Sequence, residues 1–367
     1  MFGRKILLMT VWVMIFESIN LSAAIPQAPV IALNLNQNTV KLSWVQVPSA
    51  QSYTLFYAPY PNPTYIGSLD MGKQTDFSVT FSQDAQYYVA LKASNTEGSS
   101  NYSNIEHFVL PEPIKIDPNV PPLKNSQWYR PQVGASWQWQ LKGTINTSYP
   151  VEIYDIDLFD TSLQSIQSLK QQGKKVICYF SAGTYEGWRP DKAAFKSEDL
   201  GKPLEDFQDE RWLDIRSLTV YQIMTQRLDL AVSKGCDGVE PDNVDAYINN
   251  SGFALNATDQ LAFNKYLANA AHQRNLSVAL KNDLDQAPHL LDYFDFSVNE
   301  QCHEYDECHA LKVFIESGKP VLNAEYDSQY RDDVNKRQAL CELSGIQKFS
   351  TLILPVNLDD QFRFSCQ

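Results

Sequence analysis

The pattern of apolar and polar positions changes character once along the chain. Between residues 25 and 111 apolar and polar residues alternate with a period of two, which is typical of strands with one buried face. The clearest examples are Val40–Trp44, Ser52–Tyr57 and Tyr87–Ala93. Turn-forming stretches separate these runs and no helical period interrupts them. Many short strands without helices predict a small all-β sandwich of the immunoglobulin type over 25–111.

From residue 123 to residue 367 short apolar runs alternate with helical stretches. We expect helices over Thr161–Gln172, Tyr221–Lys234 and Thr258–Arg274, the last capped by Thr258. The runs expected to form eight strands are Val151–Tyr154, Val176–Phe180, Trp212–Ile215, Gly238–Pro241, Val278–Lys281, Phe296–Glu300, Val321–Ala324 and Thr351–Pro355. Such alternation predicts an α/β domain, a TIM-type (β/α)8 barrel over 123–367. The proline-rich stretch 112–122 predicts an extended linker between the two domains.

Polar residues follow nearly every strand of the predicted barrel, where the active sites of these barrels lie. The candidates are Asp155, Asp157, Tyr185, Glu240, Asp242, Asp245, Lys281, Asn282, Glu300, Glu325 and Tyr326. Acidic groups dominate, which suits glycoside cleavage: one carboxylate attacks or stabilises the anomeric carbon, and a second carboxyl group protonates the leaving oxygen. Strand alternation places Glu240 and Asp242 on one face, and spacing alone does not decide which of them meets the glycosidic bond. Trp137, Trp139 and Trp188 are candidate apolar faces for sugar rings, although a single aromatic residue is more often part of a core.

Seven short motifs in the predicted barrel resemble those of a known family. The strings WQWQL (137–141), YDID (154–157), CYFSAGTYE (178–186), GVEPDNVD (238–245), LKND (280–283), VNEQC (298–302) and NAEY (323–326) look like glycoside hydrolase family 114, the endo-α-1,4-polygalactosaminidases. This resemblance implies a hydrolase of α-1,4-linked galactosamine polymers with Asp242 as nucleophile and Glu300 as acid/base. We therefore expect a retaining enzyme, whose two carboxyl groups lie about 5–5.5 Å apart. The remaining candidates are expected to bind substrate or support the pair.

The N-terminal strands resemble a fibronectin type III module. Trp44 matches its core tryptophan, and Tyr87, Val89 and Leu91 match its penultimate strand. The resemblance implies a spacer or accessory module beside the catalytic domain and no chemistry of its own.

The N-terminus and the cysteines indicate export. Arg4 and Lys5 precede the apolar run Ile6–Phe16, and Ser22-Ala23-Ala24 follows it, so 1–24 is read as a cleaved signal peptide of a secreted or periplasmic protein. The run is too short to span a bilayer, so no membrane association is expected after cleavage. Six cysteines permit disulfides in that compartment. We expect the bridges Cys302–Cys308 and Cys341–Cys366, and a free, buried thiol at Cys178.

Charge and motifs narrow the function further. A net charge of −13 and a pI near 4.8 disfavour nucleic-acid binding and favour a cationic ligand. No glycine-rich phosphate loop follows a strand, and no cofactor or metal is expected. Zinc at Cys302-His303 and Cys308-His309 is an alternative, although this spacing is too tight for the usual zinc geometry. We expect a monomer whose partner is a polysaccharide. Two other functions stay open: a non-catalytic polysaccharide-binding protein, and a deacetylase of the same polymer.

Overall fold

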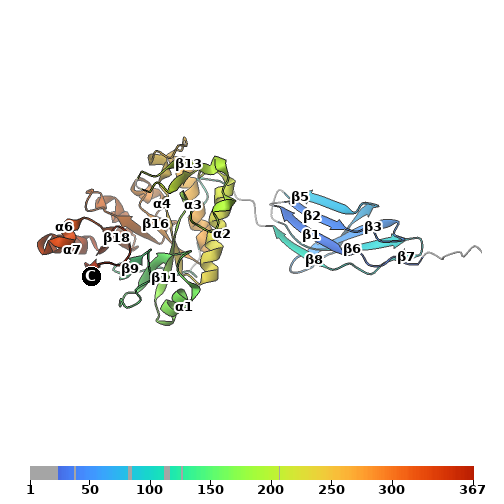
Figure 1. Cartoon of the computed structure of the whole chain (residues 1–367), viewed down its shortest axis with the longest axis horizontal. Coiled ribbons are helices and arrows are strands. Elements are labelled where there is room, and N and C mark those ends of the chain that lie inside the picture. The colour runs from blue at the N-terminus through green and yellow to red at the C-terminus, as the bar shows by residue number, and fades with distance from the viewer. Residues whose placement is uncertain (1–23, 37–38, 82–84, 111–115, 125–126, 206) are drawn as a thin grey trace, which may run out of the picture. The chain divides into compact units, whose positions relative to one another are not determined.

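The computed structural model describes residues 24–367 apart from 37–38, 82–84, 111–115, 125–126 and 206 (Figure 1). The chain divides into two compact units, Met1–Pro113 and Ile114–Gln367. The predicted signal peptide, except its last residue, and the first part of the predicted linker lie outside the described residues. None of the helices in the described part of the chain is both long and apolar enough to cross a membrane.

The N-terminal unit is a sandwich of two antiparallel sheets. One sheet has the order β1–β2–β5, formed by Ile31–Asn36, Thr39–Trp44 and Asp76–Thr80. The other has the order β4–β3–β6–β7, with β8 also paired to β6, formed by Gly67–Gly72, Ser52–Pro59, Ala85–Asn95, Gly98–Ser99 and Glu106–Leu110. The inward residues of both sheets form one core, in which Trp44 packs edge-on against Tyr53 with ring centroids 5.7 Å apart. The alternating pattern therefore produces a two-layered all-β unit, as predicted.

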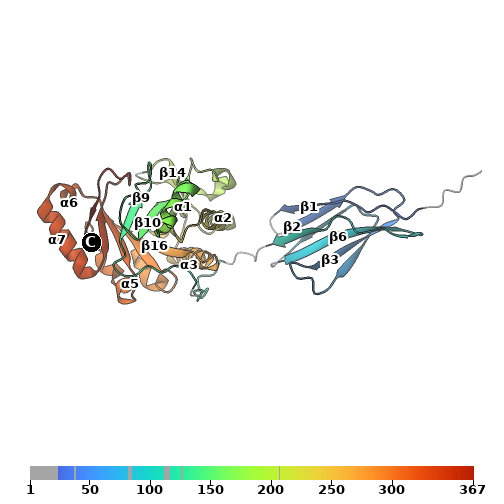
Figure 2. The same cartoon turned by 90° about the horizontal axis from the view of Figure 1, so that it is seen from below.

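The C-terminal unit is built on a curled nine-stranded sheet (Figures 1 and 2). Eight parallel strands run in the order β9, β10, β11, β15, β16, β17, β18, β19, and the short β20 pairs antiparallel with β19. Their bounds are Trp137–Gln140, Ile153–Asp157, Lys175–Ser181, Gly238–Asp242, Ser277–Lys281, Phe296–Glu300, Val321–Glu325, Ser350–Ile353 and, for β20, Phe364–Ser365. No backbone ladder joins β9 to β19 among the residues that the structure describes. Hydrogen bonds nevertheless connect the two edges, from the indole of Trp137 to the carbonyl of Ser350 and from the N–H of Leu141 to the carbonyl of Leu358.

Helices cover the outer face of this sheet (Figure 1). They are α1 (Leu163–Gln171), α2 (Leu218–Lys234), α3 (Ala257–Gln273), α4 (Ala287–Leu290), α5 (Lys312–Glu316), α6 (Ser328–Asp332) and α7 (Val334–Gln347). Single 3-10 turns lie at Lys192–Ala194, Ser197–Asp199, Ala246–Ile248, Leu284–Gln286 and Cys308–Leu311. Helix α2 ends at Gly235, whose φ of 84° is the left-handed cap that glycine favours. Helix α3 is capped by Asn256 and not by Thr258 as expected, because the Asn256 side chain accepts from two N–H groups while Asp259 completes a capping box.

One predicted strand has a different place. Trp212–Ile215 was expected in the barrel, but β14 (Glu210–Leu213) belongs to a small antiparallel sheet with β12 (Thr184–Glu186) and β13 (Leu200–Pro203). This small sheet is inserted between β11 and α2. The eighth parallel strand is instead β9, which precedes β10 and whose Gln138 and Gln140 are buried.

Three disulfides staple the C-terminal unit. Cys302–Cys308 and Cys341–Cys366 form as predicted. The expectation of a free thiol at Cys178 is wrong, because Cys178 on β11 is joined to Cys236, which lies just before the neighbouring strand β15. A half-cystine and a free thiol are equally buried in such a strand, so burial could not distinguish them.

Candidate active site

Three charged residues occupy the ends of three neighbouring strands. Asp242, Lys281 and Glu300 are the last residues of β15, β16 and β17. In each case the next residue has a left-handed backbone, with φ of 58° at Asn243, 48° at Asn282 and 61° at Gln301. Such a residue ends the strand at once, and asparagine tolerates this conformation better than most residues. The three side chains therefore converge at the carboxyl edge of the sheet.

Lys281 is the centre of this convergence. Its ammonium lies 2.9 Å from Asp242 Oδ1 and 2.8 Å from Glu300 Oε2, and its side chain is only 3% exposed. A third carboxylate oxygen, Glu240 Oε1, is 3.9 Å away, and the ring of Trp139 lies 5.2 Å from the ammonium. Burial by itself would lower the pKa of Lys281, but the charges of Asp242 and Glu300 outweigh it and hold the pKa well above its ordinary value. Lys281 is therefore a fixed cation between two carboxylates.

Asp242 is held from both of its oxygens. Oδ1 accepts from Lys281 and, at 2.7 Å, from the N–H of Asn243, and Oδ2 accepts from the hydroxyl of Tyr179 at 3.0 Å. Burial, together with the charge of Asp242, raises the pKa of Tyr179, which therefore stays a donor. Gly183 allows the loop behind Asp242 to pack closely against Asn243, because a Cβ at residue 183 would lie 1.7 Å from the carbonyl oxygen of Asn243. Hydrogen bonds and one cation thus fix the orientation of Asp242.

Glu300 is oriented by the strand on its other side. Its Oε1 accepts from the hydroxyl of Tyr326 at 2.5 Å, and its Oε2 accepts from Lys281 and, at 3.5 Å, from the amide of Asn282. The carbonyl oxygen of the Asn282 side chain accepts from the N–H of Glu300 itself. Asp242 is 16% exposed and Glu300 is 27% exposed, so both reach the solvent of the cleft while the lysine between them does not.

The pair opens into a cleft of about 570 Å³. Aromatic residues line it together with the charged groups: Trp139, Tyr179, Trp188, Phe207 and Trp212. Trp188 and Phe207 are each more than half exposed. Large exposed rings at a polar cleft are suited to the apolar faces of sugar rings.

A second ion-pair network forms one wall of the cleft. Arg189, almost fully buried, lies 2.6 Å from Asp157 Oδ2 and 2.7 Å from Glu186 Oε1. Asp157 also accepts from the N–H groups of Phe159 and Asp160. Both oxygens of Asp157 therefore accept hydrogen bonds from within the protein.

Two carboxylates of the cleft have no cation partner in the described part of the chain. Asp245 receives only a 3.3 Å contact from the amide of Asn249, and Glu210 accepts from the hydroxyl of Thr184. Burial and the charge of Asp242 raise the pKa of Asp245 to about 6. Burial also raises the pKa of Glu210 to about 7, against the lowering effect of its hydrogen bond to Thr184. Groups of this kind are available to a positively charged ligand.

The structure brings together most of the residues singled out in the sequence. Asp157, Asp242, Asp245, Lys281, Asn282 and Glu300 line the cleft, and Tyr326 contacts Glu300. Asp155 and Glu240 lie beneath it, fully buried.

Three other candidates lie elsewhere. Glu325 points to the opposite face of β18, where it accepts from the N–H of His303 and from the amide of Asn323. Tyr185 packs edge-on against Phe195. Trp137 is fully buried in the core within the curled sheet. Strand alternation thus separates Glu325 from its neighbour Tyr326, which contacts Glu300.

Sequence reasoning missed several members of the site. Tyr179, Asn243, Glu186, Arg189, Phe207 and Glu210 were not chosen. Tyr179 had a usable signal, because it lies two residues before the strand end at Ser181 and so shares the inward face of β11. Arg189 and Glu210 belong to the inserted segment between β11 and α2, and nothing in their local pattern marks them.

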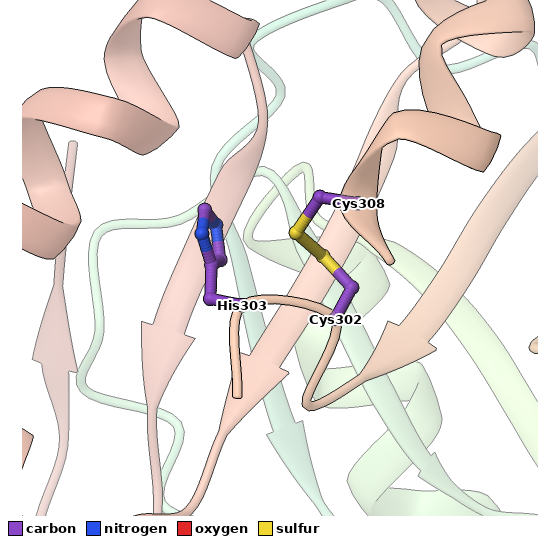
Figure 3. Close-up of side chains that lie close together, drawn as sticks. All are labelled: Cys302, His303 and Cys308. Atoms are coloured by element: carbon purple, nitrogen blue, oxygen red, sulfur yellow. A yellow bond between two sulfur atoms is a disulfide. The ribbon is translucent and has the colours of Figure 1, made fainter. Parts of the chain in front are cut away.

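Two of the expected ligands in the zinc alternative, Cys302 and Cys308, are joined in a disulfide bond. The two sulfurs of Cys302 and Cys308 and a ring nitrogen of His303 lie within 4.8 Å of one another, and Figure 3 shows His303 beside the disulfide that joins the sulfurs. Zinc requires thiolates, which a disulfide does not offer. His309 is not part of this group.

A curled parallel sheet whose strand ends present paired carboxylates and aromatic rings in a cleft defines the class of carbohydrate-cleaving barrel enzymes. The comparisons agree: the chain belongs to glycoside-hydrolase family GH114, whose family model matches residues 119–367. It is a glycosidase, and the family has a TIM-type barrel fold. No curated protein matches the chain.

Solved structures give the same assignment. The crystal structure of Aspergillus fumigatus Ega3 in complex with galactosamine is 45% identical and covers 66% of this chain and 99% of that one, with a TM-score of 0.62. The glycoside hydrolase domain of PelA from Pseudomonas aeruginosa is 13% identical and covers 63% of this chain and 98% of that one, with a TM-score of 0.51, which shows a shared fold.

Proposed function

We propose that this protein is an endo-acting glycosidase that hydrolyses α-1,4-linked galactosamine polymers with retention of configuration. In this proposal Asp242 is the nucleophile and Glu300 is the acid/base. The observation that carries it is the single ammonium of Lys281, which contacts both carboxylates. Because those contacts measure 2.9 Å and 2.8 Å, the two contacting oxygens lie no further apart than the sum of these distances. That bound suits the roughly 5–5.5 Å spacing of retaining enzymes and falls short of the roughly 6.5–9.5 Å that an inverting enzyme needs for its water.

The contacts support a specific course for the two steps. Asp242 attacks the anomeric carbon and forms a glycosyl ester, while Glu300 gives its proton to the departing glycosidic oxygen. The negative charge thereby passes from Asp242 to Glu300, and Lys281 compensates it at either place. In the second step Glu300 takes a proton from water, the resulting hydroxide attacks the anomeric carbon and Asp242 leaves as a carboxylate. Tyr179 and Tyr326 hold the two carboxylates in their attacking and donating orientations.

We infer the substrate from the charges in the cleft and from the ligand bound in a related crystal structure. Ega3, 45% identical, was crystallised with galactosamine. In the described part of the chain no cation lies within ion-pair distance of Asp245 or Glu210 in the cleft, and amino sugars that are not acetylated are cationic near neutral pH. A polymer of such sugars would supply the missing positive charges. The net charge of −13 also favours its approach.

Neither alternative function has an observation in its favour. A non-catalytic binding protein has no need for a lysine shared between two carboxylates. A deacetylase of this kind needs a metal bound by His and Asp side chains, and the one group of potential metal ligands found among the described residues consists of a disulfide and His303.

We extend the proposal to the whole chain. The strand order of the N-terminal sandwich supports a fibronectin type III-like module over 25–111, and the eight parallel strands of the second unit support a (β/α)8 barrel. Three disulfides favour an oxidising compartment, in agreement with a signal peptide over 1–24 and a secreted or periplasmic enzyme.

The test is digestion of a partly deacetylated α-1,4-galactosamine polymer by the full mature chain. We expect new reducing ends and shorter chains, with the α-anomer formed first in NMR spectra recorded during the reaction. Asp242→Asn and Glu300→Gln should each reduce kcat by at least about a thousandfold. Glu316→Gln, an exposed change of equal charge on α5, is the matched control. Near-full activity of either site variant, or release of acetate without new reducing ends, would contradict the proposal.

A further inference from the structure

Two carboxyl groups lie beneath the site and take no part in the steps described above. Asp155 on β10 and Glu240 on β15 are both fully buried, and each carboxyl group shifts the pKa of the other. Glu240 Oε1 lies 3.9 Å from the ammonium of Lys281. The buried pair is therefore linked to the catalytic carboxylates through one lysine.

The lack of hydrogen-bond donors to these carboxyl oxygens favours a proton within the pair. None of the four oxygens accepts a well-formed hydrogen bond from an N–H or O–H group of any described residue. The N–H of Ile156 lowers the pKa of Asp155, although neither Asp155 oxygen has a hydrogen-bond partner among the described residues. Two ionised carboxylates cannot donate to each other, so a hydrogen bond between them is possible only when one of them is protonated.

The charge balance of the cluster points the same way. The titratable groups that face the pair are Lys281 from β16, Asp242 from β15, Tyr179 from β11 and Tyr326 after β18. Both tyrosines are neutral donors, so one lysine faces four acids, counting Glu300. If all four acids were ionised, three negative charges would stand uncompensated in a buried space, which is very costly.

Electrostatics favours Glu240 as the residue that holds the proton. Burial, and then the charge of Asp155, raises the pKa of Glu240 well above its ordinary value. Burial also raises the pKa of Asp155, but only to about 7, because the hydrogen bond with Glu240 and the charge of Lys281 act against it. The pair therefore changes from two protons to one as the pH rises through neutrality.

We propose that Asp155 and Glu240 are positioning residues that share a proton and, through Lys281, set the proton affinity of Glu300. With one proton the pair carries a negative charge that draws on Lys281 from below and weakens its hold on Glu300. Glu300 then keeps its proton to higher pH, which is the form that the first step requires. With two protons the pair is neutral, and Lys281 compensates only Asp242 and Glu300. This inference rests on the roles proposed above for Asp242 and Glu300.

Two isosteric variants separate charge from packing. Glu240→Gln leaves an amide that donates to an ionised Asp155, so the pair carries a permanent charge of −1. Asp155→Asn leaves protonated Glu240 donating to the Asn oxygen, so the pair is neutral. Both variants preserve the shape and the hydrogen bond. The readout is the pH profile of kcat/KM on a soluble α-1,4-linked galactosamine oligosaccharide, with thermal melts to verify folding.

We expect the alkaline limb of Glu240→Gln to lie about one pH unit above that of Asp155→Asn, the shift caused by one charge roughly 10 Å away at an effective dielectric constant of about 20. The wild-type profile should follow Asp155→Asn at acid pH and Glu240→Gln at alkaline pH. Superimposable profiles of the two variants would overturn the proposal, because a packing role alone moves no limb.

A second measurement needs no activity. Carbon-13 carboxyl signals of the full wild-type chain should show one aspartate and one glutamate, identified by their loss in the two variants, with the aspartate titrating near neutrality and the glutamate still protonated there. Independent titration of both near pH 4 would end the idea even if hydrolysis is confirmed. Conversely, an active Asp242→Asn enzyme would refute the proposed catalytic roles, while the shared proton would still be visible in these spectra.

Discussion

Replacing Lys281 by methionine tests the electrostatic core of the site most directly. Methionine retains most of the unbranched stem and removes the charge. Lys281 is the one cation within ion-pair distance of Asp242 and Glu300 among the described residues, at 2.9 Å and 2.8 Å. The variant therefore leaves two neighbouring carboxylates without compensation and leaves Glu240 without its positive neighbour.

The magnitude follows from the contact geometry. A unit charge pair about 3 Å apart is worth about 5 kcal/mol at an effective dielectric constant of about 20. Asp242 and Glu300 are 16% and 27% exposed, so water replaces part of this interaction. Removing one partner from a buried pair typically costs about 3–5 kcal/mol. We expect the free energy of unfolding at pH 7.5 to fall by about 3 kcal/mol, and kcat to fall at least about a hundredfold, since nothing then compensates the charge that moves between the carboxylates.

The loss of stability caused by Lys281→Met should be larger at high pH than at low pH. Lys281 has a raised pKa, so its own contribution is fully present below the ordinary lysine value and constant across the neutral range. In the variant the crowded carboxylates bind protons more tightly than the same groups in the unfolded chain, which titrate near pH 4. The difference in stability between wild type and variant is therefore greatest above neutrality and shrinks as the pH falls towards 4.

Urea unfolding at pH 7.5 and pH 5.0 measures this difference, with Lys312→Met as the control because Lys312 is 73% exposed and pairs only with an exposed glutamate. A variant as stable as the wild type at both pH values would refute the reasoning. So would an equal loss at both, because it would indicate lost packing and not lost charge.

Three further variants test separate parts of the site. Gly183→Ala places a Cβ 1.7 Å from the Asn243 carbonyl oxygen, so the loop behind Asp242 must move, and kcat should fall at least about tenfold while the wild-type fold persists in circular dichroism. Asp283→Asn should raise Tm by a few degrees at pH 8.5 and by less at pH 5, because burial raises the pKa of Asp283 to about 8 and the native state therefore loses stability as the pH rises from about 4 to 8; an unchanged Tm at pH 8.5 would contradict this. Asp245→Asn should raise KM several-fold for a deacetylated oligosaccharide and leave KM for an acetylated one unchanged, and the wild-type KM should rise below about pH 6 as Asp245 is protonated.

The strand ends that carry the site could be predicted from the sequence, because each depends on only a few consecutive residues. An apolar run followed at once by Asp242, Lys281 or Glu300 identifies a buried strand and its exit, and parallel strands place such exits on one edge. The two short-range disulfides were likewise visible in the spacing of the cysteines. What these features share is that each depends on a few consecutive residues and a known direction of the chain.

The strand that was predicted in the wrong sheet shows the limit of prediction from the local sequence pattern. Residues 212–215 are as apolar as a barrel strand, but the carbonyl of Gly183 takes the N–H of Leu213, and β12 and β13 supply the remaining partners. Strand β9 shows the converse. Its Gln138 and Gln140 are polar in sequence but buried, and their amide nitrogens donate to Asp360 and to the backbone of the following loop. Pairing between distant segments decided both cases.

Glu240 and Asp242 define the limit most sharply. They are the same kind of group, two positions apart on one strand, and alternation places both on the inward face. Two residues correspond to about 7 Å along a strand. Over that distance Glu240 is fully buried while Asp242 stays 16% exposed. Burial raises the pKa of the deeper carboxyl group, Glu240, well above its ordinary value, while the shallower one, Asp242, contacts Lys281, Tyr179 and solvent. Depth within a curled sheet depends on all its strands together, so the difference between the two acids belongs to the fold and not to the motif that contains them.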